Sequence, residues 1–394
     1  MAELAGRIAA ELDWQQGQIV GLNLNSSRPA QLGRLFYGRR VDEVARMLPL
    51  LFSACTVGQR LAFARAVEQC RGIVISDDVA VARQVLLQLE NGRELLFRLV
   101  QHWLPSTPKQ LQLLQPLQRL ISTMEQRWGF LLTPVAPTLS GATHRLDREA
   151  LKRDQQDVVR QLRQILEPLL GMPLECLASW LQQAAPTTIA VGILLQPLTS
   201  LQQRFAGLCL GPDLAELPDL QQRQQRQILG SKDAKLQQTL FCATPRWQEH
   251  CCETGSYVRY RTELQGMRQQ GWHELCCRYG AILLQLSDIP KRLLATESIQ
   301  MVSSNIAAEV GLAVVDTARG QLLHRLVLDA EQIRCYDIVA PTEWNLHPQG
   351  LVPSKLQGVA TATVSEALAL SRTMLLLADP CVEFDLKLKT EDAI

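Results

Sequence analysis

Three short segments in the last third of the chain carry its most distinctive pattern. They read VVDTARGQLLH at residues 314–324, DIVAPTEWNLHPQG at 337–350 and ADPCVEF at 378–384. Two segments nearer the N-terminus belong with them, FSACTVGQRLAFARAVE at 52–68 and CETGSYVR at 252–259. Cysteine, arginine and hydroxyl side chains recur in these segments, which come from both ends of the chain. A site built from them requires that the two ends of the chain converge.

The composition is that of an ordinary globular protein. The chain has 394 residues, with 47% hydrophobic and 20% charged residues, which is not the composition of a disordered protein. The formal net charge of +1 gives no overall attraction to nucleic acid or to an anionic membrane. The first residues lack the basic and apolar regions of a signal peptide, and glutamines and prolines interrupt the longest uncharged stretch, 176–203. We expect a cytoplasmic protein without nucleic-acid or membrane partners.

The eleven cysteines argue against a disulfide framework, because their number is odd and the expected compartment is reducing. The most conspicuous group is HCC at 250–252 followed by HELCC at 273–277. Adjacent cysteines rarely bind one ion together and neither half has C-x2-C spacing, so we expect these residues to be buried in helix faces. The sequence also lacks a G-x-S-x-G elbow, a Walker loop, an H-E-x-x-H motif and a dinucleotide fingerprint. Motifs alone therefore indicate no catalytic site.

Periodicity predicts a mostly helical middle with small groups of strands at both ends. An N-terminal hairpin is expected over 6–24, a helical middle over 41–310 and a mixed C-terminal part over 311–394. The expected elements are helices from Val41, over 55–70, over 76–104 and from Asp147, strands at 313–315, 326–328 and 337–339, a helix at 364–377 before a short tail, and a solvated helix or loop at 220–228.

The order and separation of the five segments resemble the large subunit of NiFe hydrogenases. That family carries an EAPRGxxxH-like segment, a VPTTWN-like segment and a terminal DPCxxC in this order, after an N-terminal CxxC and an ExGxxAR element. The resemblance covers nearly the whole chain and is weakest from 107 to 246. It implies an α+β, mostly helical fold with a central bundle of long helices and small peripheral β-sheets. It also implies one domain over 1–394, because cysteines from opposite ends must meet.

The departures from that family concern its metal ligands. In the family, four cysteinates from two CxxC pairs hold nickel and iron. Here the first pair reads Phe52 and Cys55, and the second reads Cys381 and Phe384. Nickel in a thiolate-rich site needs all four soft ligands, and phenylalanine cannot replace sulfur. We therefore expect no nickel, and the two phenylalanines are expected to exclude nickel and water.

Three further family residues are also missing. The family histidine after the first pair is Gln59 here, and the magnesium-binding histidine after the second pair falls on Lys387. The glutamate used for proton transfer falls on Ala5. Without that base, heterolytic hydrogen chemistry lacks its proton acceptor. The resemblance therefore implies a protein that is not an enzyme.

The iron side of the family site is retained. In the family, iron carries one CO and two cyanides, the cyanides accept hydrogen bonds from fixed donors, and the CO faces an apolar wall. The resemblance implies that Cys55 and Cys381 hold an Fe(CN)2(CO) fragment transiently. It assigns Arg319 and Thr342 as donors to cyanide and Leu322 as the apolar wall. The residues expected around this set are His324, Gln59 and Asn345.

This pattern of retention and loss is similar to the HupK/HoxV family of hydrogenase expression/formation proteins. The resemblance implies a non-catalytic maturation scaffold or chaperone that carries the iron fragment to the genuine hydrogenase large subunit, with other maturation proteins as partners. One alternative is an interaction platform with an empty relic pocket. Another is an unusual hydrogenase large subunit with relocated nickel ligands, for which Cys70 or the Cys251/Cys252 pair are candidates. A quinone-reductase-type subunit is a third, against which the DPC segment argues.

Overall fold

The computed structural model describes residues 6–29, 32–52, 54–105, 107, 112–135, 146–188, 191–220, 238–294 and 310–389. Ala5 lies outside these ranges, as does the predicted Gln-rich helix or loop from residue 221 onward.

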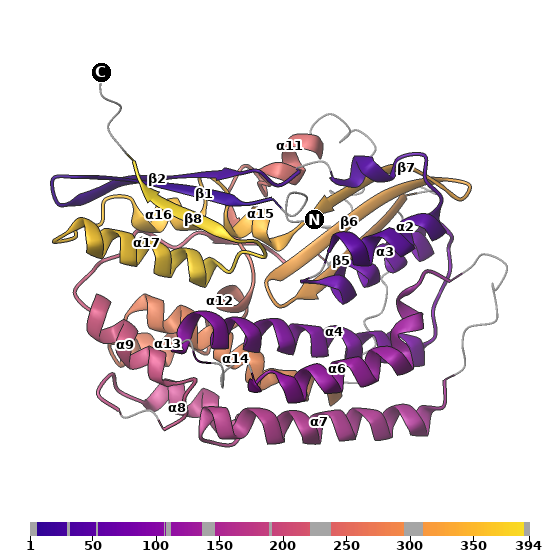
Figure 1. Ribbon diagram of the computed structural model, residues 1–394, viewed down its shortest axis with the longest axis horizontal. Helices are drawn as coiled ribbons and strands as arrows, with labels where there is room; N and C mark the ends of the chain where they lie inside the picture. Colours follow the sequence, from indigo (N-terminus) through magenta and orange to yellow (C-terminus); the bar gives the residue numbers. More distant parts are fainter. Residues whose placement is uncertain are drawn as a thin grey trace.

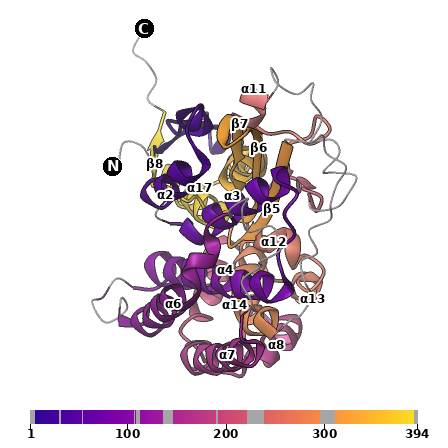
Figure 2. The same ribbon diagram turned by 90° about the vertical axis from the view of Figure 1, so that its right-hand side faces the viewer.

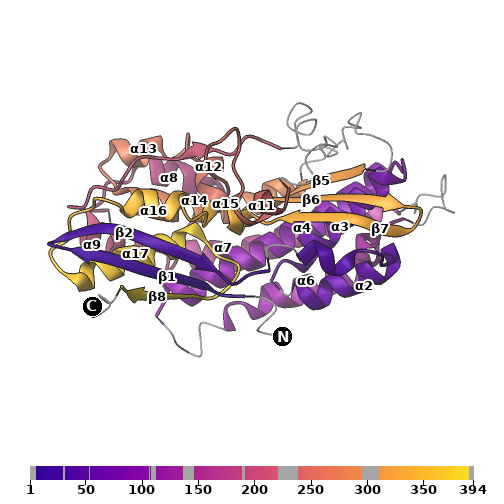
Figure 3. The same cartoon turned by 90° about the horizontal axis from the view of Figure 1, so that it is seen from above.

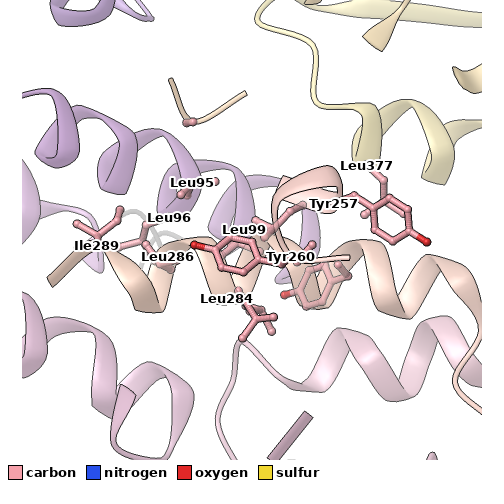
Figure 4. Packing of buried hydrophobic residues seen from close by; sticks show 14 of the residues in the cluster. Leu95, Leu96, Leu99, Tyr257, Tyr260, Leu284, Leu286, Ile289 and Leu377 are labelled. Carbon is pink, nitrogen blue, oxygen red and sulfur yellow. The ribbon is translucent and has the colours of Figure 1, made fainter. Parts of the chain in front are cut away.

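Four long helices form one layer of the molecule, below two small sheets in Figure 1. They are α4 (Asp77–Arg98), α6 (Gln115–Trp128), α7 (Arg148–Leu170) and α14 (Glu274–Leu294). Apolar residues at helical spacing produce this layer, because each helix has one face that must be buried. Figure 4 shows leucines of α4 and α14 that belong to the main hydrophobic core. Within the described residues, every helix is too short or too polar to cross a bilayer.

The predicted helices near the N-terminus and in the middle are present. The helix expected from Val41 is α2 (Val41–Leu51), and the one expected over 55–70 is α3 (Thr56–Cys70). The helix expected up to residue 104 ends earlier, because α4 passes into a π-helical turn at Leu99–Trp103. The remaining helices are α8 (Leu177–Gln183), α9 (Gln196–Phe205), α11 (Gln238–Ala243), α12 (Ser256–Arg259), α13 (Gln265–Gln269), α15 (Pro341–Asn345), α16 (Leu351–Leu356) and α17 (Val364–Ala378), with short 3-10 turns at Leu32–Phe36, Gly129–Leu132 and Leu174–Cys176.

One sheet joins the two ends of the chain. The predicted hairpin is β1 (Ile8–Gln15) and β2 (Gln18–Ser26), and β8 (Phe384–Leu388) pairs in parallel with β1, so the order is β2-β1-β8. The expected short C-terminal tail is therefore wrong. Its sequence FDLKL alternates apolar and polar residues, which allows Phe384 and Leu386 to pack on the core while the edge of β1 accepts the strand. Figure 3 shows this sheet beside the second one.

The second sheet is the meander β5 (Val310–Thr317), β6 (Gly320–Asp329) and β7 (Gln332–Val339). The strand predicted at 313–315 is the middle of β5, whereas those predicted at 326–328 and 337–339 form the C-terminal parts of β6 and β7. Helix α3 packs against β5 and β6. Figure 2 shows α3 and this sheet above the layer of long helices. A two-residue parallel pair, β3 (Ala215–Glu216) with β4 (Cys252–Glu253), was not predicted because so short a pairing leaves no periodicity to detect.

Candidate functional site

Two cysteines from opposite ends of the chain, Cys55 and Cys381, are close enough to interact electrostatically. Cys55 directly precedes α3, and Cys381 lies in the turn between α17 and β8. Burial raises the pKa of the Cys55 thiol to about 12, and the neighbouring Cys381 and Glu90 raise it further, while Arg319 and a hydrogen bond from Gln59 oppose the rise. Cys55 is therefore a neutral thiol at pH 7. A metal that binds its sulfur must displace this proton.

A chain of hydrogen bonds reaches Cys55 from the sheet. The Nε2 atom of Gln59 donates to the sulfur of Cys55 at 3.7 Å. This orientation turns the amide oxygen of Gln59 to His324 Nε2 at 2.8 Å, so Nε2 carries the imidazole proton. His324 Nδ1 then accepts from the Tyr336 hydroxyl at 2.8 Å. Burial lowers the pKa of His324 to about 3, which keeps the ring neutral and preserves this direction of donation.

Arg319 occupies the turn of the β5–β6 hairpin. Its backbone N–H donates to Thr317 Oγ1 at 3.3 Å, and the same hydroxyl donates to the Gly320 carbonyl at 2.8 Å. The Nδ2 atom of Asn345 donates to the Arg319 carbonyl at 3.2 Å. Gly255 has φ +105°, and a Cβ there would lie 2.6 Å from the same carbonyl oxygen. Close packing and side-chain hydrogen bonds therefore set the position of Arg319.

The side chains expected to contact the iron ligands are all buried. Arg319 pairs through Nη2 with Glu94 at 3.1 Å, and its buried Nε has no hydrogen-bond partner within the described residues. Thr342, at the start of α15, donates its hydroxyl to the sulfur of Cys381 at 3.2 Å. Leu322 lies beside the first turn of α3, close to Gly58. The structure thus brings Arg319 near Cys55, Thr342 to Cys381 and Leu322 to the same helix end.

Sequence reasoning missed the acidic residues of α4. The Glu90 carboxylate accepts from the backbone N–H groups of Val57 at 2.7 Å and Gly58 at 2.8 Å, so it caps the N-terminus of α3. Burial raises the pKa of Glu90 to about 7, although both amides oppose the rise. Glu94, one turn further on, holds Arg319. Two glutamates one turn apart in a long apolar helix are the sequence signal that points to such a role.

The remaining sequence predictions have mixed outcomes. Cys276 and Cys277 are fully buried in helix α14, as predicted. The prediction is wrong for residues 250–252, because Cys252 is buried in the short strand β4, while Cys251 is half-buried and His250 exposed outside any helix. Phe52 packs beside α3 and lines a surface pocket, and Phe384 begins β8 with the Arg372 guanidinium 5.6 Å from its ring centroid. Among the described residues, no three histidine, cysteine, aspartate or glutamate side chains are placed to hold a metal ion.

The architecture is that of the hydrogenase large subunit, which confirms the predicted fold. An H2-activated NiFeSe hydrogenase from Dm. baculatum matches with a TM-score of 0.56 at 12% identity, over 93% of this chain and 94% of that chain. The reduced Ni-Fe-Se hydrogenase from D. vulgaris Hildenborough gives a TM-score of 0.55 at 12% identity, over 93% and 94%. At this level of identity the likeness shows the fold alone.

Full-length relatives then specify the family. The hydrogenase expression/formation protein HupV of Azotobacter chroococcum mcd 1 is 30% identical over 98% of this chain and 99% of its own. HupK of Azotobacter vinelandii is 29% identical over 98% and 99%, and HoxV of Cupriavidus necator 26% over 96% and 95%. No protein-family model matches the chain. The chain belongs to the HupK/HupV/HoxV family of hydrogenase expression/formation proteins, as its motifs predicted.

Proposed function

We propose that this protein is a non-catalytic scaffold of hydrogenase maturation that carries an Fe(CN)2(CO) fragment as cargo. Cys55 and Cys381 bind the iron, and the fragment then passes to the genuine hydrogenase large subunit with the help of other maturation proteins. The family membership supports a role in hydrogenase formation. The observation that carries the cargo is the electrostatic interaction of Cys55 with both Cys381 and the buried Arg319, whose Nε has no hydrogen-bond partner among the described residues.

The donor set suits this cargo. Two thiolates and three diatomic ligands give iron five ligands without a third protein group, in keeping with the two cysteines available here. The Nε–H of Arg319, which has no partner in the part of the chain that the structure describes, suits an anionic nitrogen acceptor that would recover the cost of a buried unpaired donor. Thr342 supplies a hydroxyl beside Cys381 as a second donor. Buried Leu322 supplies an apolar surface, which suits CO because CO needs no hydrogen-bond donor.

Loading and release follow from the protonation of the thiols. Binding forms two Fe–S bonds and releases two thiol protons, without a change in the oxidation state of iron. Because burial raises the pKa of Cys55 to about 12, protons compete with iron for its sulfur. This competition makes the cargo exchangeable, which a carrier requires and a permanent metal centre does not. Phe52 and Phe384, in place of two cysteines, leave nickel without a thiolate set.

Infrared spectroscopy and metal analysis test the proposal. We expect protein purified without oxygen, after co-expression with hydrogenase maturation proteins, to show two cyanide bands and one CO band. The sample is expected to contain iron and little nickel. The Cys55→Ala/Cys381→Ala variant should lose the bands and the iron. The matched control Cys176→Ala/Cys209→Ala removes two exposed thiols and should keep both.

Other outcomes would favour the alternatives. Absence of the bands from the parent protein would reject the carrier, and intact hydrogenase maturation with the Cys55→Ala/Cys381→Ala variant would indicate an interaction platform. Stoichiometric nickel with hydrogen-dependent dye reduction would indicate an unusual hydrogenase large subunit.

A further inference from the structure

A pocket on the surface is lined by residues that neighbour the candidate site in the sequence. Its lining runs from the exposed side chains of Arg34 and Tyr37 to buried residues of β7 and the loop that follows it. Phe52, three residues before Cys55, forms part of the wall. Glu343, the neighbour of Thr342, forms another part. The pocket therefore connects an exposed surface to the elements that carry both halves of the candidate site.

Arg28 lines this pocket and interacts electrostatically with both thiols. Its side chain is only 13% exposed and lines the pocket, where Nη1 lies 3.0 Å from a carboxylate oxygen of Glu343. The same guanidinium is close enough to Cys381 and Cys55 to interact with charge on either sulfur, more strongly with Cys381. A Cβ at Gly6 would lie 2.6 Å from the Arg28 Cα, so the backbone at this position is tightly packed.

The net charge of the loaded iron centre indicates a role for Arg28 as a counter-charge. An iron(II) fragment with two cyanides and one CO is neutral, and ligation by two thiolates makes the centre a dianion. Arg319 is one buried cation that interacts with Cys55, but Glu94 already pairs with it. A dianion in a poorly hydrated site needs a second cation. Arg28 is a cation within electrostatic reach of both sulfurs, and it also faces the outside of the site.

We propose that this pocket is the port through which small anions reach the thiols, and that Arg28 is the positioning residue that attracts them and then neutralises the loaded centre. The ligand class is a small, cyanide-bearing iron species that enters as an anion, because the otherwise neutral fragment keeps anionic ligands until the two thiolates replace them. The identity of this anion rests on the proposed function, whereas the anion port itself does not. The Arg28–Glu343 pair holds the guanidinium at the wall of the pocket until an anion takes the place of the carboxylate.

Two alkylating reagents of similar size but different charge test the port on the empty, full-length protein. Iodoacetate is an anion and iodoacetamide is neutral, and each replaces the thiol proton of Cys381 with a carbon while iodide leaves. Mass spectrometry gives the two rates at Cys381, normalised to the exposed Cys209 of the same molecule. We expect Arg28→Gln to lower the ratio of iodoacetate to iodoacetamide rates about fivefold, the size expected for one unit charge acting across about 4 Å of well-hydrated surroundings.

Two further variants separate charge from folding. Arg28→Lys keeps the positive charge and should retain the parent ratio to within about twofold. Arg46→Gln removes an exposed arginine of α2 and should leave the ratio unchanged. A general loosening of the fold would raise both rates together and leave their ratio unchanged. An Arg28→Gln ratio equal to the parent ratio would overturn the port.

The two proposals fail in different ways. Infrared bands in the parent protein with an unchanged Arg28→Gln ratio would reject the port and keep the carrier. A fivefold lower ratio in a protein that never shows cyanide bands would keep the anion port and reject the carrier. With both proposals correct, Arg28→Gln protein from the co-expression experiment contains at most about a fifth of the parent iron.

Discussion

We expect the Glu90→Gln variant to lose a pH dependence of stability that the parent chain possesses. Glu90 is 2% exposed and caps the first turn of α3, directly after Cys55. Its pKa rises from 4.5 to about 7, because burial disfavours the carboxylate more than the amides of Val57 and Gly58 favour it. The folded chain therefore holds this proton more tightly than the unfolded chain does.

The sign and size follow from this difference. Below pH 4.5 both states are protonated and the full contribution to stability is present, and it is lost as the pH rises from 4.5 to about 7. At about 1.4 kcal/mol per pH unit, the loss amounts to ~3 kcal/mol by pH 8. Glutamine carries no proton to lose, and its amide group leaves one backbone N–H of α3 without an acceptor. That second effect costs ~1–3 kcal/mol at every pH.

Urea denaturation between pH 4.5 and 8 measures the prediction. The free energy of unfolding of the parent, minus that of Glu90→Gln, should fall by ~3 kcal/mol across this range. Glu149→Gln removes a glutamate whose side chain is 72% exposed and serves as the control. A parent-minus-Glu90→Gln difference that stays constant within about 0.5 kcal/mol would refute the buried carboxylate as the source.

Two further changes test how Arg319 and Cys55 are held. Gly255→Ala places a Cβ against the Arg319 carbonyl, so we expect the cyanide bands to weaken or shift and the free energy of unfolding to fall by ~2–4 kcal/mol. The control Gly271→Ala, at φ +87° with no atom within 4 Å of the new Cβ, should lose only ~1 kcal/mol and keep the bands. Equal losses of stability in the two variants would contradict the role of the Gly255 contact. Tyr336→Phe removes the donor to His324 Nδ1 and should cost ~1–3 kcal/mol in urea denaturation, whereas an unchanged midpoint would show that this hydrogen bond does not stabilise the fold.

Local patterns predicted most of the architecture. The hairpin, α2, α3, α7 and α17 follow from spacing and caps, and Asp147 illustrates this because its side chain accepts from the backbone N–H groups of Glu149 and Ala150. The prediction of a C-terminal tail was wrong because a five-residue strand is stable only on the edge of β1, hundreds of positions away. Such pairing leaves no trace in the local sequence beyond the alternation of FDLKL.

The sequence by itself determined which residues are predicted at the centre of the candidate site. Cys55, Cys381, Arg319, Thr342 and Leu322 stand in motifs whose order is legible without a structure. These motifs also identified the family, because thiolate loss beside retained donors is a property of residue types and not of coordinates.

Only the tertiary structure decided how that site is charged and reached. Glu90 and Glu94 on α4, and Arg28 after β2, stand in no recognisable motif, and they act through long-range proximity and burial. The direction of donation from Tyr336 through His324 to Cys55 likewise depends on three segments that meet in space. The strength of an electrostatic interaction depends on distance and on the exclusion of water, and neither exists until the chain has folded.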